Sequence, residues 1–193
     1  KLHEGCDTSG CVLSLKKTVL GSRTIDCLGH TITRAGRKAA EKKVELVASW
    51  PLPKSTAELR SFFCVCVYLR GYVFRFADKT YAFKKYLRGK GATPIKEFAT
   101  DPLATKSFEL LKNSLQNHAT LQHIDYERAQ NPGATNGGVQ VSIDASRYGY
   151  SFCISQSPGL GKPPALCVYR GRSFSDRERA WSTLERELYA FLY

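Results

Sequence analysis

The spacing of the apolar residues changes once along this chain of 193 residues. In the central part, apolar side chains recur three or four positions apart, as Leu59 and Phe62 do, which is typical of an amphipathic helix. After a polar loop over 127–138 they recur at every second position, as in Val141 and Ile143, which is typical of a half-buried strand. The pattern predicts an α+β chain in which helices precede a sheet.

Helix caps and turn residues give the expected order of elements. The predicted elements are a hairpin over 12–33 that turns at Gly21-Ser22, helices over 37–49, 55–69, 78–89 and 101–115, strands over 139–143 and through 152–154, a strand over 165–169, and a last helix opened by Ser175 and Glu178 with Trp181, Leu184, Leu188 and Phe191 on its apolar face. In this scheme Asp78 caps the third helix, and Asp101 followed by Pro102 starts the fourth.

The chain carries a large positive charge. It has 29 Lys and Arg against 17 Asp and Glu, a formal net charge of +12. A surplus of this size attracts polyanions, and nucleic acid is the polyanion that we expect, since no apolar stretch reaches the roughly 18 residues of a membrane span. The basic clusters expected to contact phosphates are Lys42 with Lys43, and Lys84 with Lys85 and Arg88.

The cysteines argue against a secreted, disulfide-bonded protein. The seven cysteines are scattered and odd in number, and residues 1–20 lack the apolar core of a signal peptide, so we expect reduced thiols in an intracellular setting, cytoplasmic or nuclear. The absence of methionine suggests a chain that begins inside a longer reading frame.

A zinc site is a weaker hypothesis. The available ligands are His3, Cys6, Cys11 and the pair Cys27 and His30. Their spacing does not match the common zinc patterns, so no zinc is expected, although a structural zinc-binding module stays an alternative.

Acidic residues near two apolar stretches are candidates for a different metal site. Asp144 ends an alternating strand, and Glu185 and Glu187 flank the apolar face of the last helix. An acid so close to a core must be solvated, paired or bound to a cation. A strand-end aspartate and a helical glutamate that converge would offer Mg²⁺ the oxygen ligands that it prefers. Periodicity does not choose between the two glutamates, and both can also be solvated flank residues.

An ordered set of short motifs runs through the chain. The motifs are Cys27-Leu28-Gly29-His30-Thr31-Ile32, Trp50-Pro51-Leu52-Pro53-Lys54, Glu58-Leu59-Arg60-Ser61-Phe62-Phe63, the stretch 108–115, Ile143-Asp144-Ala145-Ser146-Arg147-Tyr148-Gly149, Tyr169-Arg170-Gly171-Arg172-Ser173-Phe174-Ser175 and Ser182-Thr183-Leu184-Glu185-Arg186-Glu187-Leu188. This set resembles the Pol polyprotein of gypsy-type long-terminal-repeat retrotransposons, from the end of the reverse transcriptase into the ribonuclease H domain.

The resemblance implies three parts. Residues 1–90 correspond to the palm-edge hairpin and helical thumb of the reverse transcriptase, residues 91–137 to the connection segment, and residues 138–193 to the first half of an RNase H-like domain, a mixed sheet with one helix. The implied parent function is RNA-directed DNA synthesis coupled to cleavage of RNA in RNA–DNA hybrids.

The resemblance also implies site residues and partners. Asp144 and Glu187 would be the first two catalytic carboxylates and ligands of two Mg²⁺ ions, with Glu185 a neighbour that has no catalytic role. The implied partners are an RNA–DNA hybrid or duplex nucleic acid and the rest of the Pol polyprotein, with no membrane and no small-molecule ligand other than the metal.

The sequence departs from the family pattern at several points. Cys64, Val67 and Gly171 stand where the family has glycine, asparagine and serine. The Y-x-D-D motif of the polymerase and the later acidic residues of ribonuclease H are absent from the chain, so we expect the isolated chain to be inactive. The alternative function is that of a non-catalytic nucleic-acid-binding remnant.

Overall fold

The computed structural model describes residues 10, 14, 16, 18–88, 91–130, 138–157, 159 and 162–192. Its elements are β1 Thr24–Cys27, β2 His30–Thr33, β3 Gly36–Ala39, α2 Glu41–Ala48, α3 Thr56–Tyr68, η2 Arg70–Tyr72, α4 Phe76–Lys84, η3 Lys85–Leu87, η4 Lys96–Phe98, α5 Pro102–Gln116, α6 Tyr126–Gln130, β4 Val139–Ala145, β5 Gly149–Gln156, β6 Ala165–Ser173, α7 Asp176–Arg179 and α8 Thr183–Leu192. Among the described helices, none combines the length and the apolar composition needed to cross a membrane.

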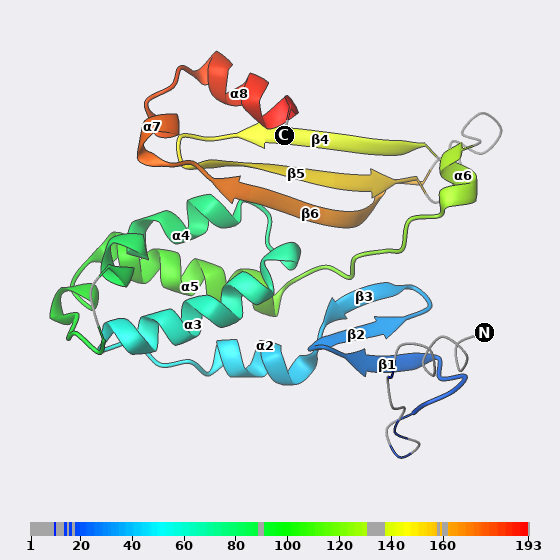
Figure 1. Cartoon of the computed structure of the whole chain (residues 1–193), viewed down its shortest axis with the longest axis horizontal. Helices are drawn as coiled ribbons and strands as arrows, with labels where there is room; N and C mark the ends of the chain where they lie inside the picture. Colours follow the sequence, from blue (N-terminus) through cyan, green and yellow to red (C-terminus); the bar gives the residue numbers. More distant parts are fainter. Residues whose placement is uncertain are drawn as a thin grey trace.

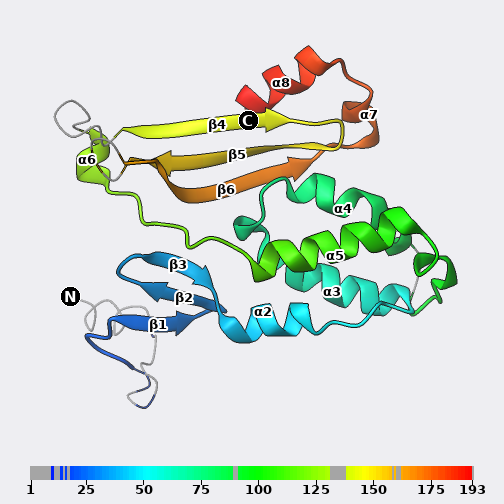
Figure 2. The ribbon, with the colours of Figure 1, turned by 180° about the vertical axis from the view of Figure 1, so that it is seen from behind.

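The elements form a helical body and a small sheet side by side, with a second small sheet lying along both (Figures 1 and 2). The helical body consists of α2 to α5 with the 3-10 turns between them. The first sheet has the order β1-β2-β3 and the second the order β4-β5-β6, and both are antiparallel. The α+β prediction is confirmed, but the second sheet is antiparallel throughout its described strands, where a mixed sheet was expected.

The first sheet differs from the predicted hairpin. The run over 24–33 is two strands joined by a tight turn at Leu28 and Gly29, whose φ angles of 49° and 71° are those of the primed turns that suit a hairpin. The predicted strand over 12–19 lies largely outside the described residues. The predicted helix over 37–49 begins only at Glu41, because Arg37 pairs its backbone with Leu121 instead.

Two predicted helix starts are confirmed by their caps. The hydroxyl of Ser55 accepts a hydrogen bond from the Glu58 backbone N–H at the start of α3. The carboxylate of Asp101 accepts from the N–H groups of Leu103 and Ala104 at the start of α5. The prediction for α4 was wrong: the helix begins at Phe76, and Asp78 lies inside its first turn.

One apolar core holds the helical body together. Phe62 and Phe108 lie at its centre with ring centroids 4.3 Å apart, and both are fully buried. The other fully buried large residues of this core are Val47, Leu59, Leu69, Phe83, Phe98, Leu111, Leu115 and Leu121. Because the core unites residues before and after position 90, the parts predicted as thumb and connection fold around a common interior.

A smaller core lies between the second sheet and the last helices. Tyr150 and Phe174 pack there against Tyr189 and Ala190 of α8. The single predicted helix is interrupted between α7 and α8, so the apolar spacing counted from Trp181 does not continue into α8. The expected apolar face was therefore wrong: Leu184, Leu188 and Phe191 are 68%, 53% and 76% exposed.

The segment after α5 connects the two sheets. Arg37 and Leu121 exchange two backbone hydrogen bonds of 2.7 and 2.9 Å, and the next N–H, that of Gln122, donates to the carbonyl of Leu166 in β6. Gly36 is required beside this pairing, because its φ is 149° and a Cβ atom there would lie 2.2 Å from the Leu121 carbonyl oxygen.

His30 links β2 to the helical body. Its ring stacks on Tyr68 with centroids 5.2 Å apart, and its Nδ1 is hydrogen-bonded to the Tyr72 hydroxyl at 2.9 Å. Burial and the nearby Arg37 guanidinium lower the pKa of His30 from its ordinary value of 6.5. The imidazole is therefore neutral near pH 7 in the folded chain.

Replacement of Phe108 by Ala should lower the free energy of unfolding by about 3–5 kcal/mol, because it removes a fully buried ring. Urea unfolding of this variant can be compared with Phe191→Ala, which removes an exposed ring and should change stability by less than about 0.5 kcal/mol. Equal losses in the two variants would contradict the assigned core.

Acidification should destabilise the chain in part through His30. The pKa of His30 is depressed in the folded state, so the unfolded chain binds the proton more readily. The contribution of neutral His30 to the free energy of unfolding is therefore complete above about pH 6.5 and is lost as the pH falls below that value. Urea midpoints of the wild type and His30→Gln at neutral and mildly acidic pH should show a smaller acid-induced loss in the variant. An unchanged loss would show that His30 does not contribute.

Candidate functional site

Asp144 lies at the end of β4, where it meets an arginine. Its carboxylate is 3.4 Å from Nε of Arg75, and the same nitrogen is 2.7 Å from the carboxylate of Asp78. Arg75 precedes α4 in a left-handed conformation with φ 53° and ψ 45°, which costs a non-glycine residue about 1 kcal/mol. The two carboxylates offset this cost, and a hydrogen bond from Ser146 to Asp78 closes the cluster.

Glu187 lies on α8, which packs against β4. Ile143 and Ala145 pack in the small core with Tyr189 and Ala190, so the face of β4 that carries them is the face toward α8. Asp144 lies between these two residues and projects from the other face, because side chains alternate along a strand. Asp144 therefore points away from the face of β4 that α8, the helix of Glu187, covers.

Glu185 has a structural explanation. Its carboxylate accepts a hydrogen bond of 2.7 Å from the Ser182 backbone N–H, and the Ser182 hydroxyl accepts one of 3.2 Å from the Glu185 N–H. This is a capping box at the start of α8, and these hydrogen bonds lower the pKa of Glu185. The spacing of Ser182 and Glu185 could have revealed it in the sequence.

The described residues offer no larger cluster of metal ligands around Asp144. Among them, no three His, Cys, Asp or Glu side chains are grouped so as to hold a metal. Asp144 shares a small pocket with Arg75, Asp78 and Ser146. The cation beside Asp144 is a guanidinium.

The predicted basic residues fall into two groups. Lys84 is half-buried and donates to the Ser173 hydroxyl at 2.5 Å, and burial lowers its pKa. Lys85 forms an ion pair of 2.7 Å with Asp101, whose pKa is lowered to about 2, mainly by this lysine. These two lysines are thus engaged within the chain.

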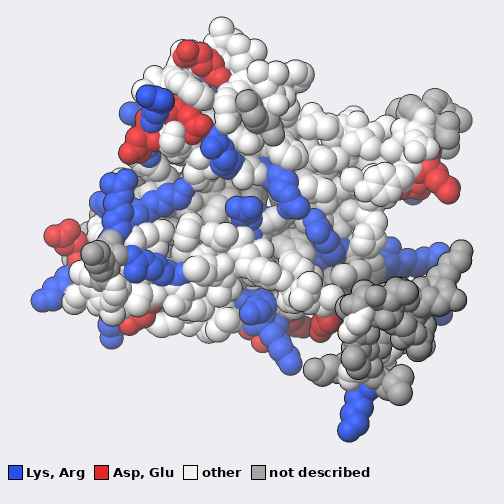
Figure 3. All heavy atoms as spheres, viewed as in Figure 1, with Lys and Arg blue, Asp and Glu red and all other residues white. Residues whose placement is uncertain are grey.

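Lys42, Lys43 and Arg88 are exposed. Over the face shown in Figure 3, Lys and Arg side chains gather along the seam between the helical body and the second sheet.

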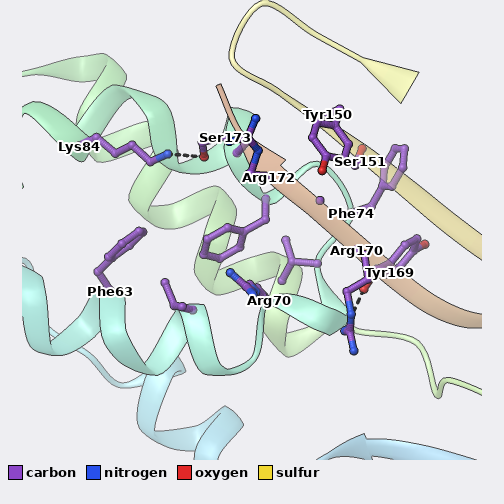
Figure 4. A pocket seen from close by; sticks show the side chains of 15 residues that line it. Phe63, Arg70, Phe74, Lys84, Tyr150, Ser151, Tyr169, Arg170, Arg172 and Ser173 are labelled. Atoms are coloured by element: carbon purple, nitrogen blue, oxygen red, sulfur yellow. Dashed lines mark hydrogen bonds between the residues drawn. The ribbon is translucent and has the colours of Figure 1, made fainter. Parts of the chain in front are cut away.

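A cavity of about 260 Å³ lies in that seam (Figure 4). Arg70 reaches it from the helical body, and Arg170 and Arg172 reach it from β6. Sequence reasoning did not select these arginines as phosphate contacts. The recurrence of arginine at every second position of the strand, at 170 and 172, was the available signal.

The alternative zinc ligands are only partly described. His3, Cys6 and Cys11 lie outside the described residues. Cys27 is an exposed free thiol. His30 uses its ring to stack on Tyr68 and its Nδ1 to bind Tyr72, which gives it a structural role in the fold.

Comparison with known proteins shows that the chain is similar to retroelement proteins. Residues 101–193 match the family described as the RNase H-like domain found in reverse transcriptase. The Pol polyproteins of the Drosophila melanogaster transposons 297 and opus are 28% and 26% identical to the chain over 94% of its length. The chain spans 15% and 18% of those two relatives.

The fold is also found in solved structures. The foamy viral protease–reverse transcriptase dRH in complex with double-stranded DNA matches 98% of this chain and 31% of its own, with a TM-score of 0.69 and 19% identity. The same viral protein in complex with an RNA/DNA hybrid matches 94% of this chain and 22% of its own, also with a TM-score of 0.69, at 20% identity.

The match to the structures covers the helical body as well as the second sheet, so the two parts share one known arrangement. Residues 101–193 are thus similar to the RNase H-like domain found in reverse transcriptases, within a chain that is similar to gypsy-type retrotransposon Pol polyproteins along almost all of its length.

Proposed function

We propose that this chain holds duplex nucleic acid, an RNA–DNA hybrid in particular, as part of a Pol polyprotein that makes DNA on an RNA template and removes the RNA. The observation that carries the proposal is the shared fold: nearly the whole chain matches a viral protein that was solved with double-stranded DNA and with an RNA/DNA hybrid. The rest of the polyprotein is then its covalent partner.

The charge of the chain supports this proposal. A net charge of +12 favours a polyanionic partner, and lysines and arginines gather along one seam of the surface. Contacts of basic side chains with phosphates are independent of base sequence, which suits a protein that must follow any template.

Binding to a short RNA–DNA hybrid should weaken linearly with the logarithm of the salt concentration. Each phosphate contact adds about 0.9 to the steepness of this dependence. If Lys42 and Lys43 contact phosphates, as the sequence predicts, the double variant Lys42→Gln with Lys43→Gln should bind with a shallower slope.

Lys85→Gln is the matched control, because Lys85 is already paired with Asp101 and its loss should leave the slope unchanged. Fluorescence anisotropy at several salt concentrations gives both slopes. Failure of the wild-type chain to bind the hybrid would contradict the proposed function itself.

A second proposal concerns cleavage of the hybrid. The family match includes both Asp144 and Glu187, which supports their assignment as catalytic carboxylates of the RNase H-like activity in the full polyprotein. Mg²⁺ would supply water activation and charge stabilisation in such a reaction. In the present arrangement Arg75 forms an ion pair with Asp144. This activity therefore requires Arg75 to separate from Asp144.

Asp144→Asn and Glu187→Gln should each abolish Mg²⁺-dependent hybrid cleavage when introduced into a full-length polyprotein. Glu185→Gln is the control, because an amide can keep its cap on α8 and the variant should retain cleavage. A labelled RNA strand in a hybrid gives the readout. Loss of cleavage in Glu185→Gln with retention in Glu187→Gln would reverse the assignment.

A further inference from the structure

A second cavity lies where β3, η2 and β6 meet. Its volume is about 400 Å³, and the residues that carry the inference are His30, Arg37, Tyr68, Arg70, Tyr72 and Arg170. The lining contains three arginines and no carboxylate. We refer to this cavity as the arginine pocket.

The three arginines come from distant parts of the sequence. Arg37 lies on β3, Arg70 on η2 and Arg170 on β6, and the backbone pairing of the segment around Leu121 brings the two sheets close enough for them to meet. The guanidinium of Arg170 lies close to Gly71: a Cβ atom on this glycine would lie 3.3 Å from Nη1 of Arg170.

These charges have no acidic partner within the part of the chain that the structure describes. The ion pairs found there use Arg75, Lys85, Lys112, Arg172 and Arg179. Three guanidinium groups that share a concave pocket repel one another, and an anion that enters it would relieve this repulsion. A guanidinium also has the planar donor geometry that matches a phosphate.

The surroundings suit a phosphate group. Nη1 of Arg170 donates to the carbonyl of Tyr169 at 3.3 Å, and the other donors of this guanidinium stay available for a ligand. The stacked rings of His30 and Tyr68 form a wall of the pocket.

The arginine pocket continues into the seam cavity of Figure 4. Val67, Arg70 and Arg170 line both cavities. A basic groove that extends past one pocket fits a chain of phosphates better than a single free nucleotide, because successive phosphates of a strand can each meet a cation.

We propose that Arg37, Arg70 and Arg170 bind the phosphodiester backbone of the duplex. The proposal rests on the proposed function and adds to it a specific set of contacts, formed by the connection of the two sheets and distinct from the lysine clusters read from the sequence.

The experiment measures hybrid binding by single variants Arg37→Gln, Arg70→Gln and Arg170→Gln over a range of salt concentrations. Each variant should weaken binding several-fold and reduce the steepness of the salt dependence by about 0.9. Arg177→Gln, which removes an exposed arginine of α7 outside the pocket, should leave the slope unchanged. Arg70→Lys keeps the charge and should retain the slope, which separates loss of a contact from loss of folding.

The outcomes separate the two proposals. If the wild type binds the hybrid and the three pocket variants keep its slope, the arginine pocket is not a backbone site although the proposed function stands. Equal losses in Arg177→Gln would indicate a general effect of net charge and would also overturn the inference. A free nucleoside triphosphate that binds the wild type but not the pocket variants, without a change in hybrid binding, would assign the pocket to a nucleotide instead. If the wild type binds no hybrid, the proposed function fails first.

Discussion

Backbone pairing after α5 is the interaction on which the arrangement of the molecule depends. Leu121 pairs with Arg37 of the first sheet, and Gln122 donates to Leu166 of the second, so two adjacent residues connect both sheets. The pairing requires close approach of the backbone, which Gly36 permits because it has no side chain. Buried backbone groups must be hydrogen-bonded, and this segment finds its partners on both sides.

The same connection creates the candidate binding surface. It fixes β3 and β6 beside the turn after α3, and the arginines that these segments carry then face one cavity. Arg37 and Arg170 are more than a hundred positions apart in the sequence. The positive groove therefore exists only once the sheets and helices have packed together. The lysine pairs that stand out in the sequence are partly bound to other residues of the chain, as the ion pair of Lys85 with Asp101 illustrates.

The acidic residues differ in whether neighbours in the sequence or distant residues determine their contacts. Glu185 and Ser182 cap α8 through hydrogen bonds between neighbours in the chain, so their spacing alone explains them. The position of Asp144 depends on which face of β4 the last helix covers and on Arg75, which lies far away in the sequence. Asp144 points away from α8 because the apolar residues on either side of it occupy the face toward that helix.

The sequence by itself determined the helical segments with strong caps, the change from helices to strands, the basic character of the chain and its likeness to retrotransposon polyproteins. Caps and periodicity act over a few residues, which is why α3 and α5 could be predicted from Ser55 and Asp101. Only the tertiary structure decided that residues 36–39 form a strand, that α8 leaves Leu184 and Leu188 exposed, and that three distant arginines share a pocket. These features depend on contacts between residues far apart in the sequence, and the spacing of neighbouring residues does not predict such contacts.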